Sequence, residues 1–393
     1  MMPVIFKIPI LNIAVPGFGL MLMIAFLASI MWAVRRAERS KANPDVILNL
    51  GFVALICGVL GCRLMYVVHY WDQFRGLGGV LPTLWAIVDI RRGGVEFYGG
   101  FLLTVVVTVL WLKFYEKVSL RWYLDICAPS LLLGLAIGRL GCFLNGCCYG
   151  TVCHLPWAMT FPFGSPAQVE QWQHKVPGAG LPEQLMLVTS GLAQPLSRES
   201  LAASNAELAA AAKQVETLQK QAVEIQKQMA GADDATKAKL QTQLRQVDQQ
   251  YTALGAPFQD VRTNMTKHGM SFDQIKAMAA AHPSQPVHPT QLYSTITALL
   301  VALLIDSIYW RRTRDGQAIF ALFAIEPVTR ILLEMIRDDN PVDVFGVLTI
   351  SQWLAVLMIA FGIIGLLVLR RMPPRSPLAQ PWTPPPSAAP AAA

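Results

Sequence analysis

Residues 122–140 read WYLDICAPSLLLGLAIGRL, and this stretch decides the fold class. Between Asp125 and Arg139 it contains no charged side chain, and its length matches the roughly 20 residues that a helix needs to cross a bilayer. Runs of similar length and composition lie on both sides of it, at residues 13–34, 46–68, 95–112, 292–310, 318–336 and 345–369. The sequence therefore predicts an all-α integral membrane protein with seven transmembrane helices.

The composition of the chain excludes an ordinary soluble domain. Of its 393 residues, 54% are hydrophobic and only 15% are charged, whereas soluble globular proteins carry about 25% charged residues. The formal net charge of +7 comes from short basic clusters beside the apolar runs. Such clusters are topology signals, so we expect contact with membrane lipid and no nucleic-acid partner.

The basic clusters fall on alternate connections, after the first, third, fifth and seventh apolar runs. Because cytoplasmic loops carry the excess of lysine and arginine, this pattern predicts an amino terminus outside and a carboxyl terminus in the cytoplasm. The first run lacks a small-residue cleavage site and is interpreted as a retained span. The clusters are Arg35, Arg36, Arg39 and Lys41; Lys113, Lys117 and Arg121; Arg311, Arg312 and Arg314; and Arg370, Arg371 and Arg375.

Four segments are expected along the chain. Residues 1–163 form a membrane core with spans one to four and a glycine-rich loop, and residues 286–372 complete the core with spans five to seven. Residues 164–285 form an extracytoplasmic insertion between these parts. Residues 373–393 are rich in proline and alanine and are predicted to be a disordered cytoplasmic tail.

The insertion contains two heptad seams. Apolar residues recur every seven positions from Leu201 to Met229, and a second series runs from Leu240 to Leu254 after a turn-like segment at 231–234. This pattern predicts an antiparallel coiled-coil hairpin over about residues 198–254. We interpret the hairpin as a spacer or as a docking arm for a protein partner.

Charged residues inside the apolar runs point to the location of a site. Such residues are costly in a membrane and usually line a cavity or pair with each other. With the predicted topology, most of them fall in the outer halves of their spans. A transporter would need ionisable groups near both faces, so a site that opens on the outer leaflet is favoured over a transport path. These residues are Arg63, Glu96, Asp125, Arg139, Asp306, Glu326, Arg330 and Glu334.

The fourth run ends in a glycine-rich stretch, GRLGCFLNGCCYG at residues 138–150. Glycines let the backbone approach a ligand closely, and they also serve helix packing and turns. The buried Arg139 needs an anion, and its planar guanidinium suits a phosphate. From chemistry alone, the stretch is a candidate site for a phospholipid head group.

The sequence resembles the bacterial prolipoprotein diacylglyceryl transferases. The stretch 138–150 is similar to the signature of that family. Four further segments match in family order: EFYGG at 96–100, Asp125 with Ala128 and Pro129, HPTQLY at 288–293, and RILLE at 330–334 followed by Arg337. The insertion and the tail lie outside the resemblance.

The resemblance implies a transferase and its substrates. The diacylglyceryl group of phosphatidylglycerol would pass to the lipobox cysteine thiol of a preprolipoprotein signal peptide, with release of glycerol phosphate. The enzyme would be a multi-pass protein of the bacterial inner membrane, with its site on the periplasmic side and no cofactor. A catalytically inactive family member that binds phospholipid or lipoproteins through its coiled-coil arm is the alternative.

The resemblance also implies which residues take part in catalysis and which bind substrate. Arg139, Arg330, Tyr98 and Glu334 are the expected catalytic residues. Two arginines suit the reaction physically, because they stabilise the charge that grows on a departing phosphate. The expected substrate-binding residues are Arg139 again with Arg63, Gly99, Gly100, Asn145, Gly146, Gly150, His288, Gln291, Tyr293 and Arg337.

Several positions depart from the usual family pattern. Tyr98 stands where many members have a histidine, Cys142 where they have an asparagine, and Phe18 where they have a tyrosine. Cys147 replaces an acid, and Glu326 stands where tyrosine is frequent. These departures leave the identity of the general base open. Tyr98, His288 and Glu334 are candidates, and arginines alone would also depress the pKa of the substrate thiol.

Four cysteines, Cys142, Cys147, Cys148 and Cys153, lie near the predicted outer face. Oxidising conditions there allow disulfides. Their spacing matches no standard paired C-x-x-C pattern, so disulfides or reduced thiols are favoured over a metal site, and no metal is predicted.

Overall fold

The computed structural model describes residues 4–8, 13–74, 79–89, 94, 96–189, 192–230, 234–337 and 348–383. The chain divides into two compact units. The first, here called the helical bundle, comprises Val4–Gly141, Thr290–Ile336 and Asn340–Ala393. The second, here called the insertion unit, comprises Met1–Pro3, Cys142–Pro289 and Arg337–Asp339. The insertion unit thus contains most of the glycine-rich stretch together with residues 164–285.

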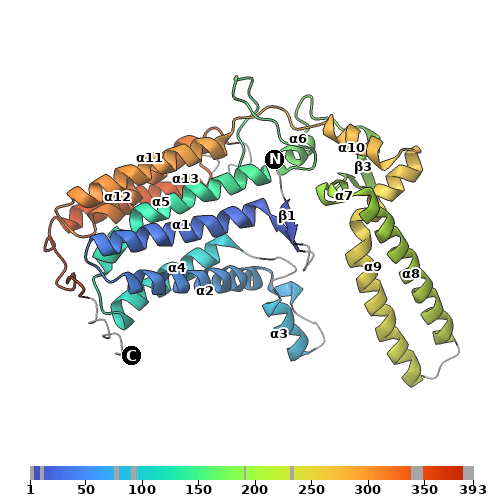
Figure 1. The fold of residues 1–393 in the computed structure, drawn as a ribbon, viewed down its shortest axis with the longest axis horizontal. Helices are drawn as coiled ribbons and strands as arrows, with labels where there is room; N and C mark the ends of the chain where they lie inside the picture. The colour runs from blue at the N-terminus through green and yellow to red at the C-terminus, as the bar shows by residue number, and fades with distance from the viewer. Residues whose placement is uncertain are drawn as a thin grey trace, which may run out of the picture. The chain divides into compact units, whose positions relative to one another are not determined.

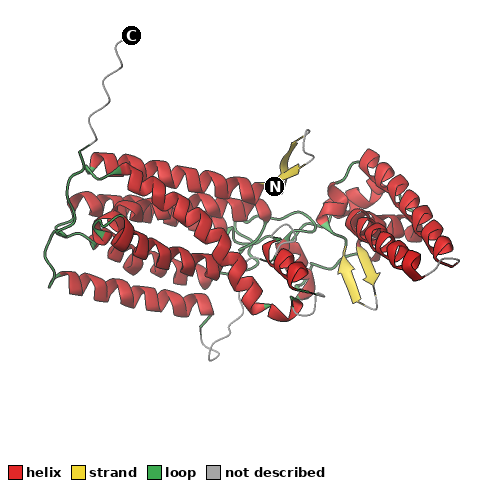
Figure 2. Ribbon diagram, turned by 90° about the horizontal axis from the view of Figure 1, so that it is seen from below, coloured by secondary structure: helices red, strands yellow, loops and turns green. Residues whose placement is uncertain are grey.

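Long helices run side by side in the bundle (Figures 1 and 2). They are α1 (Gly17–Arg39), α2 (Pro44–His69), α4 (Phe97–Leu110), α5 (Leu120–Asn145), α11 (Thr290–Arg311), α12 (Gln317–Glu334) and α13 (Ile350–Leu369). Within the described residues, six helices are long and apolar enough to cross a membrane: Gly17–Arg39, Pro44–His69, Tyr98–Tyr115, Leu120–Asn145, Thr290–Arg311 and Ile350–Leu369. The predicted sixth span forms α12, a helix of 18 residues that carries Glu326, Arg330 and Glu334 and is less apolar for that reason.

The bundle also contains elements that the apolar runs do not predict. Residues 13–16, assigned to the first span, instead form strand β2 (Ile13–Pro16), which pairs antiparallel with β1 (Val4–Ile8). Helix α1 begins only after Pro16, whose ring fixes φ and removes a donor. A short helix, α3 (Val80–Val88), follows the 3-10 turn η1 (Trp71–Gln73), and α4 continues into the π-helical turn η3 (Trp111–Tyr115). Residues 345–347 of the predicted seventh span lie outside the described residues.

A charged pair joins two helices of the bundle. Arg36 of α1 forms a salt bridge with Asp306 of α11, and its Nε donates to the carbonyl of Ile126 at 3.1 Å. The guanidinium also lies 4.2 Å from the ring centre of Tyr309. An arginine of the first basic cluster therefore pairs with an acid that the sequence places inside the fifth span.

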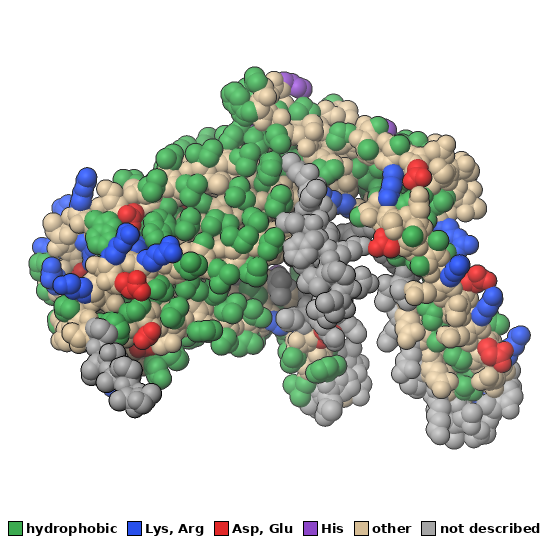
Figure 3. Space-filling view, viewed as in Figure 1, with side chains coloured by type: hydrophobic (Ala, Val, Ile, Leu, Met, Phe, Trp, Pro, Cys, Tyr) green, Lys and Arg blue, Asp and Glu red, His purple; other side chains and the backbone are tan. Residues whose placement is uncertain are grey.

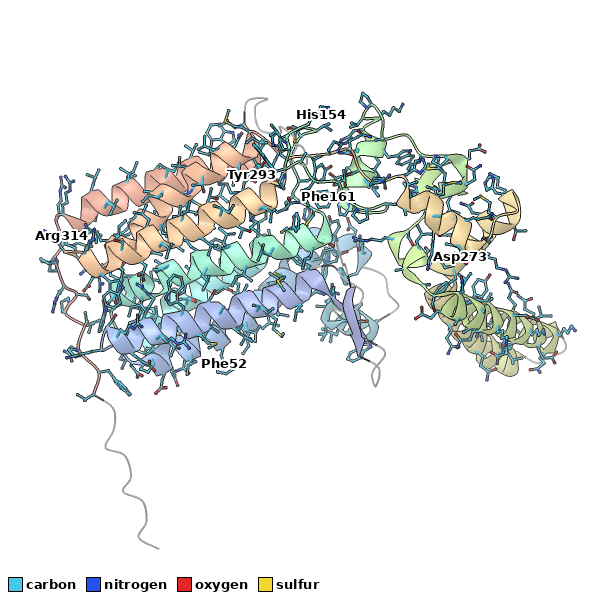
Figure 4. The ribbon with its side chains drawn as sticks, turned by 45° about the horizontal axis from the view of Figure 1, so that its top comes forward. Phe52, His154, Phe161, Asp273, Tyr293 and Arg314 are labelled. Carbon is cyan, nitrogen blue, oxygen red and sulfur yellow. The ribbon has the colours of Figure 1, made fainter. Side chains whose placement is uncertain are left out.

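The basic clusters meet at one end of the bundle. The Arg121 guanidinium donates to the Pro373 carbonyl, Arg314 donates to the Leu369 carbonyl, and the Lys41 carbonyl accepts from Trp382. Lysine and arginine side chains gather at this end, here called the basic end, whereas hydrophobic side chains cover the flank of the helices (Figure 3). Figure 4 labels Arg314 at this end and Tyr293 at the opposite end. We call the Tyr293 end the polar end, because Arg139 and Arg330 lie there too, near the ends of α5 and α12.

The insertion unit is built around two long helices, α8 (Asn205–Ala230) and α9 (Asp234–His268), which fold back on each other as a hairpin (Figure 1). The other elements are α6 (Pro166–Gln173), η4 (Glu183–Leu185), β3 (Met186–Thr189), β4 (Leu192–Pro195), α7 (Arg198–Ala202) and α10 (Phe272–Ala280). Strands β3 and β4 pair antiparallel, so the fold is mostly helical with two small hairpins of strands.

The predicted heptad seam of the first arm helix occupies the covered face of α8. Ala211, Val215 and Leu218 are buried, and Tyr251 of α9 accepts a hydrogen bond from Gln219 at 3.3 Å. The base of α9 belongs to a separate small core with α10 and η4, and it extends well beyond the expected end at residue 254. Val261 is fully buried there.

Candidate active site

Two arginines and a glutamate share the polar end of the bundle. Arg139 lies on α5, and Glu326 and Arg330 lie one turn apart on α12. Glu326 interacts electrostatically with both guanidinium groups. Among the described residues, no side-chain hydrogen bond or salt bridge holds Arg139. The fold therefore brings together two cations from different helices, with an acid beside them.

Glu334 lies one turn beyond Arg330 on α12. Its side chain is buried, with 5% exposed, and its carboxylate accepts a hydrogen bond from the Thr349 hydroxyl at 3.4 Å. Thr349 caps α13 and forms a capping box with Gln352. Glu334 thus joins the end of α12 to the beginning of α13, which is a structural task in addition to any chemical one.

Arg63 has a structural role that the sequence does not reveal. Its Nε donates to the carbonyl of Ile87 at 2.7 Å, and its Nη2 donates to Ala86 at 2.7 Å and to Asp89 at 3.0 Å. A third nitrogen, Nη1, donates to Gly94 at 2.8 Å. These carbonyls belong to the last turn of α3 and the segment after it, where a cation is favourable. Most donors of this guanidinium are committed to backbone, which argues against Arg63 as a phosphate ligand.

Gly99 and Gly100 lie where α4 crosses α2. A Cβ at Gly61 of α2 would lie 2.5 Å from the Gly99 carbonyl oxygen, and a Cβ at Gly100 would lie 2.6 Å from the Gly58 carbonyl oxygen. The two backbones touch, so these glycines are required for close helix packing.

Tyr98 stands in the first turn of α4, with 55% of its side chain exposed. Two residues before Tyr98, Glu96 forms a hydrogen bond with His69, whose Nδ1 lies 2.8 Å from the glutamate Oε1. The ring of His69 stacks on Tyr70. Gln291 and Tyr293 lie in the first turn of α11, where Gln291 is fully buried.

The remaining signature residues lie in the insertion unit. Asn145 is the last residue of α5, and Gly146 then turns the chain with φ +83°, a conformation that favours glycine. A Cβ at Gly146 would lie 3.0 Å from Cδ1 of Phe161. Gly150 donates to the His288 carbonyl at 3.0 Å and also pairs with Arg337 as an isolated bridge. His154 and Phe161 of this unit are labelled in Figure 4.

Three cysteine thiols form a cluster in the insertion unit. The sulfur atoms of Cys142, Cys147 and Cys148 lie within 4.8 Å of one another, and Cys153 is buried outside the group. None of the seven cysteines forms a disulfide. A hydrogen bond with Cys142 lowers the pKa of the Cys147 thiol, but hydrogen bonding with Cys148 and burial outweigh it and raise that pKa overall.

A family model described as prolipoprotein diacylglyceryl transferase matches residues 3–203 and 234–368. The chain belongs to the prolipoprotein diacylglyceryl transferase family. The match is broader than the motifs alone indicate, because it leaves out only residues 204–233 of the insertion, which contain the whole of α8.

Individual relatives carry the same name, phosphatidylglycerol--prolipoprotein diacylglyceryl transferase. One from Rhodopirellula baltica is 29% identical over 385 residues, which cover 91% of this chain and 73% of the relative. One from Vibrio vulnificus is 38% identical over 170 residues, covering 42% of this chain and 58% of the relative. One from Aliivibrio salmonicida is 34% identical over 166 residues, covering 42% and 56%. The latter two matches thus span little more than half of the relatives.

Two groups of side chains in this transferase family member could not be predicted from the sequence: the pair of His69 and Glu96, and the cluster of three thiols. His69 is the last residue of α2, and Glu96, 27 residues later, immediately precedes α4, so His69 alone gives no signal of a partner. The thiol cluster was visible only as nearby cysteines, because its closeness depends on the positive φ of Gly146. Only the glycine-rich spacing of the stretch 138–150 hints that the cysteines of this segment come close together.

Proposed function

We propose that this chain transfers the sn-1,2-diacylglyceryl group of phosphatidylglycerol to the lipobox cysteine of preprolipoproteins. The products are a thioether-linked lipoprotein precursor and glycerol phosphate. Membership of the prolipoprotein diacylglyceryl transferase family supports the reaction class, and the names of the relatives supply both substrates. The observation that carries the proposal is the pair of arginines, Arg139 and Arg330, gathered with Glu326 at the polar end of the bundle.

The chemistry explains why two arginines are needed. The thiol sulfur attacks the glycerol carbon that bears the phosphate, a carbon–sulfur bond forms, and the carbon–oxygen bond breaks. Its electron pair passes to the phosphate oxygen, so a phosphodiester with one negative charge becomes a monoester that carries up to two. Guanidinium groups from two helices, α5 and α12, stabilise this growing charge more than the starting charge, and this difference lowers the barrier.

Glu326 lowers the net positive charge of the group that it forms with the two arginines. With its carboxylate ionised, Arg139, Arg330 and Glu326 together carry a single positive charge, which complements the single negative charge of a phospholipid phosphodiester. The acid also reduces the repulsion between two cations on neighbouring helices. Glu326 is therefore proposed as a positioning residue for the arginines.

The thiol proton needs an acceptor. Tyr98, His288 and Glu334 remain the proposed candidates, because each has an ionisable group and belongs to a motif that resembles the family. His69 paired with Glu96 is an additional acceptor of suitable chemistry at the polar end, since a carboxylate orients an imidazole and stabilises its protonated form. Cationic arginines near the thiol also favour its thiolate.

The other proposed substrate contacts fall into two groups. Asn145, Gly146, Gly150, His288, Gln291, Tyr293 and Arg337 keep their proposed role in binding substrate. Arg63, Gly99 and Gly100 have backbone and packing contacts that account for them without a ligand. For these three, we propose an indirect contribution through the shape of the polar end.

We further propose seven spans, with α12 joining the six apolar helices. Helix α12 packs against the α13 glycines, because a Cβ at Gly362 would lie 2.6 Å from the backbone nitrogen of Ala324. The basic end then faces the cytoplasm, which puts the amino terminus outside and the polar end at the periplasmic side of the inner membrane. The hairpin of α8 and α9 is proposed to be extracytoplasmic and to dock a protein partner.

Complementation tests the function most simply. The gene is expressed in a bacterial strain depleted of its own diacylglyceryl transferase, and growth and the mobility shift of a reporter prolipoprotein are followed. Rescue by the wild-type chain, with no rescue by Arg139→Ala at equal membrane abundance, is expected. Equal rescue by both, or none by a wild-type chain that is well inserted, would contradict the proposal.

A further inference from the structure

The thiol cluster is held together by the backbone at the end of α5. The Cys142 carbonyl accepts hydrogen bonds from the N–H groups of Gly146 at 2.9 Å and Cys147 at 3.2 Å. Gly146 then turns the chain with its positive φ, and Cys148 adopts φ +58°. This turn carries Cys147 and Cys148 back toward the side chain of Cys142.

The left-handed conformation of Cys148 is unfavourable for a residue with a Cβ, by roughly 1–2 kcal/mol. Asparagine and glycine tolerate such a position better. The chain instead has a cysteine there, and its thiol points into the cluster. A function for the Cys148 thiol would explain why a cysteine occupies this position in place of glycine or asparagine.

A disulfide explains the cluster poorly. A bond between any two of the three sulfurs uses only two of them and leaves the third as a reduced thiol, and Cys153 lies outside the group. Adjacent cysteines such as Cys147 and Cys148 also bridge only with backbone distortion. Three thiols that converge from one turn instead resemble a set of metal ligands.

We propose that Cys142, Cys147 and Cys148 bind one thiophilic metal ion of the Zn²⁺ class as three thiolates. In a tetrahedral site with Zn–S bonds of about 2.3 Å, the sulfur atoms are about 3.8 Å apart, so the observed cluster needs only a small contraction. The ligand set consists entirely of sulfur, which selects Zn²⁺ or a similarly soft ion over Mg²⁺ or Ca²⁺. A cation is also favourable at the carboxyl end of α5.

Three protein ligands leave the fourth position of the metal open, as in catalytic zinc sites. This part of the inference rests on the proposed function, whose acceptor is a cysteine thiol. A thiol that coordinates the metal loses its proton to solvent and is held as a thiolate. The site would therefore bind the acceptor cysteine in its nucleophilic form.

Cobalt substitution tests the site without measuring transfer. The full-length protein is purified in detergent with reductant, depleted of metal, and titrated with Co²⁺ while thiolate-to-cobalt absorption is recorded. Saturation at one Co²⁺ per chain is expected, with displacement by Zn²⁺. Cys147→Ser and Cys148→Ser should lose the absorption, whereas the matched control Cys153→Ser should keep it, and thermal unfolding shows that each variant is folded.

A peptide completes the test. A lipobox peptide should change the cobalt spectrum, and the same peptide with serine in place of cysteine should not. No stoichiometric cobalt binding, equal loss in Cys153→Ser, or a disulfide within the cluster in protein isolated without reductant would overturn the metal site. An unchanged spectrum with the cysteine peptide would overturn its open position. None of these results bears on rescue in the complementation assay, which tests the proposed function separately.

Discussion

The carboxylate of Asp125 accepts a hydrogen bond from the backbone N–H of Gly316 at 2.7 Å and a second from Ile319 at 2.9 Å. Asp125 belongs to α5, and these N–H groups begin α12. Gly316 itself has no side chain to cap that helix. The helix that carries Arg330 is therefore positioned by an acid on the helix that carries Arg139.

Replacing Asp125 by alanine should destabilise the bundle. The substitution leaves two buried N–H groups and the nearby Arg312 cation without their carboxylate, which typically costs about 3–5 kcal/mol. A large drop in the thermal unfolding temperature in detergent is expected. Asp45→Ala, an exposed acid in the first turn of α2, should cost less than about 1 kcal/mol. Equal stability of the two variants would refute the capping role.

The crossing of α2 and α4 offers a test with two neighbouring glycines. Gly61→Ala places a Cβ 2.5 Å from the Gly99 carbonyl oxygen, so the helices must separate. Gly58→Ala meets nothing closer than Thr104 Oγ1 at 3.9 Å. We expect Gly61→Ala to lower the unfolding temperature and the transfer rate, with Gly58→Ala close to wild type. The prediction fails if both variants behave alike.

Sequence reasoning was most successful where the physics depends on spacing alone. Six of the predicted apolar runs form long apolar helices, and Ala211, Val215 and Leu218 of the predicted heptad seam are buried on α8. The orientation that the basic clusters predict stays a prediction. The start of α1 could not be predicted, because residues 13–16 pair with β1 as strand β2, and no apolar pattern encodes that pairing.

Roles that depend on tertiary partners could not be predicted. Arg63 looks like an anion ligand in sequence, but its partners are backbone carbonyls after α3, a helix too short to give a periodic signal. The partners of His69 and of the cysteine cluster likewise come from folding and turn geometry. Arg139 and Arg330 are conspicuous in the sequence because charges in apolar helices are few, and their role stays a prediction.

The hairpin should be dispensable for the core reaction. Gln219 and Tyr251 face each other across it, so residues 220–250 can be replaced by a short Gly/Ser linker without moving the remaining ends. Because the base of α9 keeps Val261 in its core, the protein should fold and transfer within about twofold of wild type, a change below about 0.5 kcal/mol. Loss of transfer by a folded deletion protein, assayed with a lipobox peptide and phosphatidylglycerol, would show that the arm takes part in the reaction.

Tyr98→Phe distinguishes two roles for the tyrosine hydroxyl. If the hydroxyl donates a hydrogen bond to the phosphate, its loss should cost about 1.5–3 kcal/mol, or roughly tenfold to hundredfold in rate. The pH profile should keep its shape. Tyr98→His should retain substantial activity with little change in the profile, because the substrate thiol is expected to be the titrating group. A shift of about two pH units or more toward acid in Tyr98→His would instead make position 98 the base, since histidine titrates near pH 6.5.

The central claim is that Arg139 and Arg330 stabilise the departing phosphate. The decisive measurement is the transfer rate of purified Arg139→Ala and Arg330→Ala, with lipobox peptide and phosphatidylglycerol, beside the control Arg371→Ala at the basic end. We predict a loss of at least about a hundredfold in each site variant, since one oxyanion-stabilising donor is typically worth about 3–4 kcal/mol, while Arg371→Ala stays near wild type. Near-normal transfer by either folded site variant would contradict the account.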